Sequence, residues 1–102
     1  MKAILRASLA ALTLALVFSI YSFADTFKAK CAMCHGATGA GDTVIGKNMK
    51  LRDLGSADAQ KQSDDELTTI IAKGKGKMSS FENKLSKEQI TDVVKFIRSL
   101  KK

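Results

Sequence analysis

The chain has 102 residues, which is enough for one domain at most. It contains no proline, no internal repeat and no low-complexity linker, and its formal net charge is +7. A positive charge suits an acidic protein surface or membrane headgroups as well as nucleic acid. For net charge alone, however, we favour the simpler interpretation that the lysines keep a small protein soluble, and we expect no nucleic-acid partner.

The first 24 residues have the three parts of a secretory signal peptide. Residues 1–6 are basic, residues 7–24 carry no charge, and the segment closes on SFA, with small residues where a signal peptidase cleaves. We therefore predict cleavage after Ala24, a domain over residues 25–102, and export to the periplasm without stable membrane insertion. The alternative is an uncleaved anchor, because 18 uncharged residues lie at the lower limit of what can span a bilayer.

The predicted domain is small for a stable fold. Its 78 residues are too few to build an ample hydrophobic core, and such chains usually gain stability from a disulfide, a metal or another cross-link. Cys31 and Cys34 are three positions apart, so a disulfide between them would close a tiny loop and restrict the unfolded chain very little. We expect the stabilising group to come from elsewhere.

The segment after the predicted signal has the apolar period of a helix. Asp25 can cap a helix that runs to about Met33, with Phe27 and Cys31 on one face. A loop with five glycines follows, over residues 35–55. A glycine-rich loop of this length inside a compact domain usually surrounds something, so we expect the chain to wrap around a bound group.

Two further helices are marked by capping boxes. The first opens at Ser63, with Glu66 three residues later, and ends at Gly74. The second opens at Ser86, with Gln89 three residues later. Its apolar stripe comprises Ile90, Val93, Val94, Ile97 and Leu100. No stretch alternates as a strand would, so we predict an all-α fold with three main helices and a long glycine-rich loop.

Both cysteines and the only histidine of the chain fall in one stretch, CAMCH, from Cys31 to His35. A thioredoxin-type cysteine pair would need a surrounding βαβ pattern, which is absent, and a zinc site would need a second ligand cluster. Cysteines at i and i+3 lie on one side of a helical turn, so both sulfurs can bond to the vinyl groups of one haem. C-x-x-C-H is the signature of this attachment. We therefore predict one covalent haem c, with Cys31 and Cys34 as its thioether links and His35 as an iron ligand.

The iron of such a haem has a second axial position. No other histidine exists, and a methionine thioether is the other common partner. Met33 is too close to the attachment site to reach the far face, and Met49 is better read as a packing residue. Met78 follows the predicted helix end by four residues, so a short extended segment can deliver it across the ring. We predict Met78 as the ligand; the alternatives are that Met78 is a core residue, or that Lys75 or Lys77 binds the iron.

With these landmarks, residues 25–102 resemble a class I cytochrome c of the small soluble bacterial type. That family has an aromatic residue four positions before the first cysteine, here Phe27, and an aromatic residue in its C-terminal helix, here Phe96. The resemblance implies that the first and last helices cross. The partners it implies for the Phe27 ring are Val93, Phe96 or Ile97.

The chain departs from the family pattern at several points. Ser79 stands where a proline often follows the methionine, and Phe23 occupies the place of a glycine at the helix contact. Members of the family often use a proline carbonyl to accept a hydrogen bond from the histidine ligand. Because this chain has no proline, we expect a backbone carbonyl near residues 45–47 to do so for His35.

Ligation by one histidine and one methionine leaves no open position for oxygen or a substrate. We therefore predict an electron carrier between redox partners rather than an enzyme. Several of five lysines are expected near the exposed haem edge, where they would steer it to acidic patches on those partners: Lys28, Lys30, Lys73, Lys75 and Lys77. Two alternatives stay open, a haem enzyme or gas sensor with an open sixth position, and a membrane-tethered cytochrome subunit of a respiratory complex.

Overall fold

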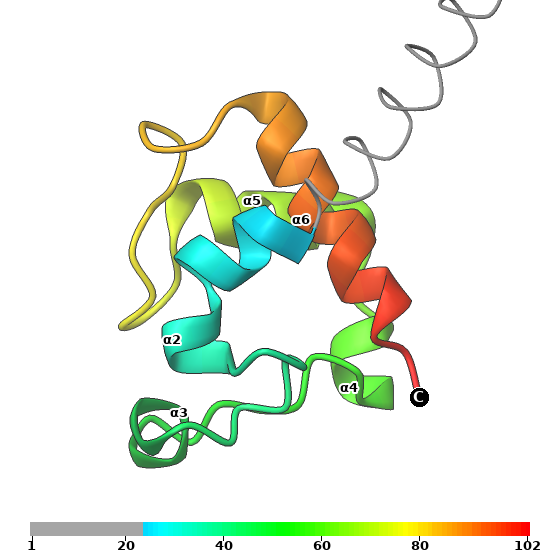
Figure 1. Cartoon of the computed structure of the whole chain (residues 1–102). Helices are drawn as coiled ribbons and strands as arrows, with labels where there is room; N and C mark the ends of the chain where they lie inside the picture. The colour runs from blue at the N-terminus through cyan, green and yellow to red at the C-terminus, as the bar shows by residue number, and fades with distance from the viewer. Residues whose placement is uncertain (1–23) are drawn as a thin grey trace, which may run out of the picture.

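The computed structural model describes residues 24–102, which fold into helices joined by turns, with no β-strand among them (Figure 1). A helical segment over residues 24–30 comes first. The later helices are α2 (Ala32–His35), α3 (Val44–Asn48), α4 (Ala57–Gln60), α5 (Asp64–Lys73) and α6 (Lys87–Ser99). The predicted all-α class is confirmed. Residues 1–23 of the predicted signal peptide, including Phe23, lie outside the described residues.

The first predicted helix is divided into two pieces. Residues 24–30 are helical, Cys31 is a turn residue, and α2 then forms the last helical turn up to His35. Residue 24 is already helical, so Asp25 is not the N-cap that the sequence predicted. The amide of Cys31 still bonds to the Phe27 carbonyl at 2.8 Å, and the His35 amide bonds to the Cys31 carbonyl at 3.0 Å. The two pieces therefore keep Phe27, Cys31 and His35 on one continuous helical path.

The helices α5 and α6 begin where their capping residues predict, and α5 also ends at the predicted glycine. The Ser63 hydroxyl accepts the Glu66 amide, and Gly74, at φ +79°, ends α5 in the left-handed region that glycine tolerates. At the start of α6, Ser86 and Gln89 form both bonds of a capping box. These bonds satisfy amides that a helix start leaves without a partner, so both helices have well-defined first turns.

The hydrophobic core lies where the first helix crosses α5 and α6. Phe27 is 1% exposed, and its ring centroid lies 4.6 Å from that of Phe96, which confirms the predicted crossing. Burying side chains of this size stabilises a fold by about 1.5–3 kcal/mol each. The buried cluster comprises Phe27, Cys31, Leu67, Ile71, Leu85, Ile90, Val93, Val94 and Ile97.

The glycine-rich loop is more regular than the sequence predicted, because it contains α3 and is followed at once by α4. Each of these short helices begins at a hydroxyl cap, Thr43 for α3 and Ser56 for α4. Gly46 lets α3 press against α2, since a Cβ there would lie 2.5 Å from the Cys34 carbonyl oxygen. The loop is thus fixed to the CAMCH turn by backbone contact.

The C-terminus closes back onto this loop beside α4 (Figure 1). The Lys102 amide donates to the Gly55 carbonyl at 3.1 Å, and the Lys102 ammonium pairs with Asp53. Within the described part of the chain, none of the helices combines the length and the apolar character needed to cross a bilayer.

Candidate functional site

A cavity of about 680 Å³ lies between the CAMCH turn and the segment that joins α5 to α6. This volume is within the range of sites that hold a cofactor-sized ligand. Most of its wall is apolar, and several charged side chains lie among the lining residues. The apolar side chains that line it include Phe27, Met49, Leu51, Leu54, Leu67, Ile70, Ile71, Met78, Phe81, Val93 and Ile97.

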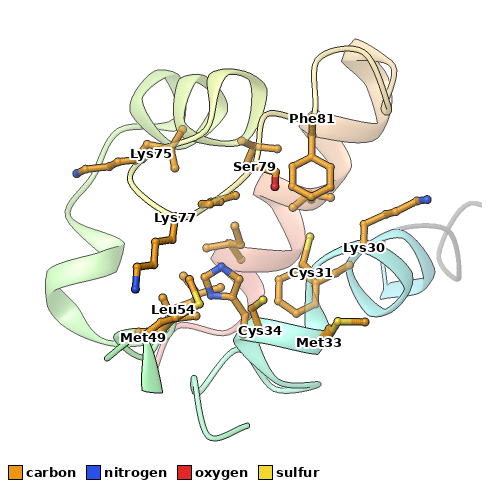
Figure 2. A pocket seen from close by; sticks show the side chains of 18 of the residues that line it. Lys30, Cys31, Met33, Cys34, Met49, Leu54, Lys75, Lys77, Ser79 and Phe81 are labelled. Atoms are coloured by element: carbon orange, nitrogen blue, oxygen red, sulfur yellow. The ribbon is translucent and has the colours of Figure 1, made fainter. Parts of the chain in front are cut away.

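Both cysteines line this cavity and are not bonded to each other. Figure 2 shows their side chains on the same side of the cavity, as the single helical turn between them requires. Burial and the nearby Cys34 raise the pKa of the Cys31 thiol to about 11. The attacking thiol of a redox-active cysteine pair has a lowered pKa instead, so Cys31 does not have the thiolate character that disulfide exchange needs.

His35 contributes a neutral imidazole to the cavity wall. Burial lowers the pKa of His35, so at neutral pH the ring carries a free lone pair that can bind a metal. Its Nδ1 atom is buried and has no hydrogen-bond partner within the described residues. A buried nitrogen without a partner marks a place on this wall for a bound group or an ordered water.

The predicted hydrogen bond from His35 to a carbonyl near residues 45–47 is wrong, because Nδ1 of His35 has no partner among the described residues. The carbonyl of Ile45 accepts the Met49 amide, that of Gly46 accepts the Leu51 amide at 2.9 Å, and that of Lys47 accepts the amides at the end of α3. The sequence predicts a loop for residues 45–47, whereas in the structure these residues belong to α3. Their carbonyls therefore accept backbone amides within and just after this helix.

Met78 lines the cavity from a short strap, which we define as residues 75–80. Lys75 and Met78 exchange two backbone hydrogen bonds, so the strap turns back on itself just before the methionine. Lys77 and Ser79, the two neighbours of Met78, lie across the cavity from the cysteines in Figure 2. The strap thus brings a thioether to the wall that faces the attachment turn.

The strap is fastened to α5 although it contains no proline. The Phe81 and Glu82 amides donate to carbonyls near the end of α5, and the Ser80 hydroxyl donates to the Ala72 carbonyl at 2.6 Å. The Lys73 ammonium pairs with Glu82 at 2.7 Å. These bonds tie the methionine segment to the helix that precedes it.

The structure places the other two candidate methionines differently. Met33 also lines the cavity, but its side chain is 75% exposed (Figure 2). Met49 is half-buried, caps the end of α3 and lies next to Leu54 on the cavity wall. All three candidate methionines therefore line the cavity, and only Met78 is carried on the strap.

The basic residues around the cavity differ from the predicted set. Lys30, Lys75 and Lys77 line it, whereas Lys28 does not, and Lys73 is engaged by Glu82. Lys50 and Arg52 also line the cavity, although the sequence does not predict them there. They lie in a loop without hydrophobic periodicity, so no sequence signal indicates which way they face.

Comparisons with known proteins agree with this geometry. Residues 20–97 match the family described as cytochrome c oxidase, cbb3-type, subunit III. A solved structure described as KustC0563 c-type cytochrome is 30% identical and has a TM-score of 0.72. That similarity covers 78% of this chain and 96% of the other chain. No curated protein matches the sequence.

The chain therefore belongs to this cytochrome c family, and its fold is that of a class I cytochrome c. Proteins of this kind carry covalently bound haem c and serve haem-based electron transfer. The cavity fits the cofactor: it has two free thiols on one side, a neutral imidazole beside them and an apolar lining. One haem c is the cofactor that a domain of this size can enclose.

Proposed function

We propose that the chain is a single-haem electron carrier in which Cys31 and Cys34 form the thioethers and His35 and Met78 are the axial ligands. The observation that carries this proposal is one cavity with the CAMCH turn on one wall and the Met78 strap facing it. His35 offers a neutral nitrogen and Met78 a neutral sulfur, and soft sulfur favours the ferrous state.

The residues around the site support electron transfer rather than catalysis. Bound haem supplies reversible one-electron chemistry. With His35 and Met78 both holding the iron, no position would be vacant for oxygen or a substrate. Phe27, Leu67 and Val93 exclude water from the buried side of the cavity, which leaves the protein to tune and shield the cofactor.

The ligand assignment is tested by comparing Met78→Leu with Met49→Leu, its matched control on the same cavity. For the holoprotein and for Met49→Leu we expect a low-spin spectrum, the weak near-infrared sulfur-to-iron band and no response to carbon monoxide. Met78→Leu should lose the band and bind carbon monoxide. Loss of the band in Met49→Leu alone would assign the ligand to Met49, and a high-spin native protein that binds carbon monoxide would favour a haem enzyme or gas sensor.

The redox partners of this carrier are proposed to have acidic docking surfaces. Lys30, Lys50, Lys75 and Lys77 line the cavity, and none of them is in an ion pair with a carboxylate of residues 24–102. Free cations around a haem edge attract an acidic surface and raise the rate of encounter.

The domain assignment is likewise a proposal: residues 1–24 are a cleaved signal, and residues 25–102 function in the periplasm. It is supported by the basic start and uncharged run of the sequence, and by the export that haem c attachment usually accompanies. The family description names an oxidase subunit, which gives the tethered alternative a specific basis. N-terminal sequencing of the exported protein decides, since a tethered subunit would retain residues 1–24.

A further inference from the structure

A wall of shared residues separates the cofactor cavity from a second pocket on the surface. The second pocket, of about 370 Å³, is more open and contains the exposed, hydrated carboxylates of Asp65 and Glu66. Three residues line both hollows, so they form the wall between them: Gln62, Ile70 and Lys75. The position of this wall therefore decides whether water reaches the cofactor cavity at the start of α5.

Gln62 is the part of this wall that no helix holds, because it lies in the turn between α4 and α5. Its amide donates to the Ala59 carbonyl at 3.3 Å, which is long for a hydrogen bond. Its side chain accepts from Arg52, which is itself exposed. These two contacts leave the backbone of the turn weakly held, so its position depends on a further contact.

Arg98 on α6 supplies that contact. Its guanidinium donates to the backbone carbonyls of Gln60, at 2.8 Å, and Gln62, and to the Asp64 carboxylate at 2.9 Å. The three acceptors follow one another along the turn, from the end of α4 to the start of α5, which lie beside α6 (Figure 1). A guanidinium suits this task because its five N–H donors are fixed in one plane. Arg98 itself is not part of the cavity lining formed by residues 24–102.

The contacts of Gln60 extend this network to another part of the cavity. The Gln60 Nε2 atom donates to the carbonyls of Leu54 and Ile97, each at 2.8 Å, and both of these residues line the cavity. Arg98, which binds the Gln60 carbonyl, therefore connects α6 to the loop side of the cavity as well as to the turn at Gln62.

The dryness of this wall matters for a haem carrier. Ferric haem carries one more positive charge than ferrous haem, so water that enters the cavity stabilises the ferric state and lowers the reduction potential. We propose that Arg98 is a positioning residue that holds Gln62 in the wall, keeps water from this side of the haem and thereby raises the reduction potential. This inference rests on the proposed haem carrier and assigns a residue outside both the CAMCH motif and the cavity lining.

The test uses two variants of the mature haem protein that open the wall in different ways. Arg98→Lys keeps the positive charge but loses the planar fork that binds two carbonyls. Ile70→Ala thins the same wall directly and leaves the hydrogen bonds of Arg98 in place. Midpoint potentials are measured by spectroelectrochemistry at high salt, where exposed charges are screened. In both variants we expect a lower potential, with the equilibrium constant for reduction by a common mediator several-fold below the native value.

Two control variants separate this role from general stability and from charge. Ile90→Val removes a buried methyl group on α6 away from the cavity lining, so it should destabilise the protein without changing the potential. Asp64→Asn removes the carboxylate that pairs with Arg98 but keeps the two carbonyl acceptors. Because the Asp64 side chain is 72% exposed, we expect the potential of Asp64→Asn to equal that of the native protein at high salt.

A second readout detects the water itself. In the reduced, diamagnetic protein, nuclear Overhauser effects between water and haem protons should appear or strengthen in Arg98→Lys and Ile70→Ala and stay at the native level in both controls. A lower potential in Ile70→Ala alone would overturn the role of Arg98, as would an Arg98→Lys protein that incorporates no haem, because the role would then be in folding. Failure of the proposed function is a separate result, since the native protein would then contain no covalent low-spin haem.

Discussion

The conformation of single glycines decides how Met78 reaches the cavity. Gly74 has φ +79°, and a Cβ there would lie 2.5 Å from the Met78 carbonyl oxygen. Gly76 also has positive φ, +57°, but a Cβ there would meet no heavy atom within 4 Å. Both glycines have positive φ, but only at Gly74 would a side chain collide with the strap. Gly74 therefore constrains the path of the strap more strictly than Gly76.

A pair of alanine substitutions separates these two effects. Gly76→Ala should lower the free energy of unfolding by about 1–2 kcal/mol, the cost of a left-handed L-residue. Gly74→Ala should lower it by more and should also weaken the near-infrared methionine band, because the strap must move away from the new methyl group. Denaturant unfolding and the band intensity measure the two consequences. An unchanged band in Gly74→Ala would contradict the role given to this glycine.

The CAMCH residues were predictable from the sequence because their spacing alone encodes the chemistry. The environment of His35 was not, since the hydrogen bonds of Ile45, Gly46 and Lys47 depend on a short helix within the loop. The same applies to Arg52, whose position depends on its contact with Gln62 ten residues later. A local motif predicts which residues can bind the cofactor, whereas tertiary structure determines which other residues contact them.

At the scale of helices, the contact of Phe27 with α6 connects the haem-attachment segment to the core. Phe27 is 1% exposed and packs on Phe96, and its ring centroid lies 6.5 Å from that of His35. The Phe27 side chain, which is buried between the first helix and α6, therefore also positions the segment that carries the cysteines.

Truncation of this side chain tests the connection. Phe27→Ala should lower the free energy of unfolding by about 3–5 kcal/mol, as expected for a large buried side chain. Phe27→Leu should cost less, because much of the volume is kept. Chemical denaturation of the holoprotein, followed by helical circular dichroism, measures both. A Phe27→Ala variant as stable as the native protein would show that the crossing does not depend on this ring.

The sequence predicts a helix most accurately where capping residues mark its ends. The bounds of α5 and α6 follow from Ser63, Gly74 and the Ser86 capping box, together with a sustained apolar period. The short helices α3 and α4 have hydroxyl caps but only four or five residues, so no period can develop. Their formation depends on close packing against the CAMCH turn and α6, which local sequence does not encode.

For the molecule as a whole, the C-terminus holds the glycine-rich loop closed. The bond from Lys102 and the one from the Gly55 amide hold the pKa of Asp53 below its ordinary value. A lowered folded-state pKa means that the ionised carboxylate stabilises the fold. This stabilisation is fully present above the ordinary pKa of an aspartate and is lost as the pH falls through the folded value.

Asp53→Asn should therefore be less stable than the native protein at neutral pH, and the difference should disappear in strong acid. The measurement is thermal unfolding of both proteins from neutral pH down to below the usual aspartate range. Asp58→Asn is a suitable control, because its carboxylate pairs with Lys61 at an exposed site. A constant difference between Asp53→Asn and the native protein at all pH values would exclude the linkage.

The distribution of charge over the whole surface governs association with partners. Replacing Lys75 and Lys77 with glutamine should slow electron exchange with an acidic redox protein several-fold at low ionic strength, and the difference should vanish at high salt. Lys87→Gln, at the start of α6 and outside the cavity wall, should have little effect. Stopped-flow rates at several salt concentrations provide the test, and rates independent of salt would contradict electrostatic steering.

The proposed function depends on a covalent bond between haem and the CAMCH turn. Its most direct test is denaturing mass spectrometry of the protein matured in a host competent for haem attachment, with extraction in acidified acetone alongside. We predict a chain heavier by one haem, a pigment that stays with the protein, and the added mass on the peptide that contains Cys31 and Cys34. A colourless product, or a pigment that passes into the acetone, would contradict the account.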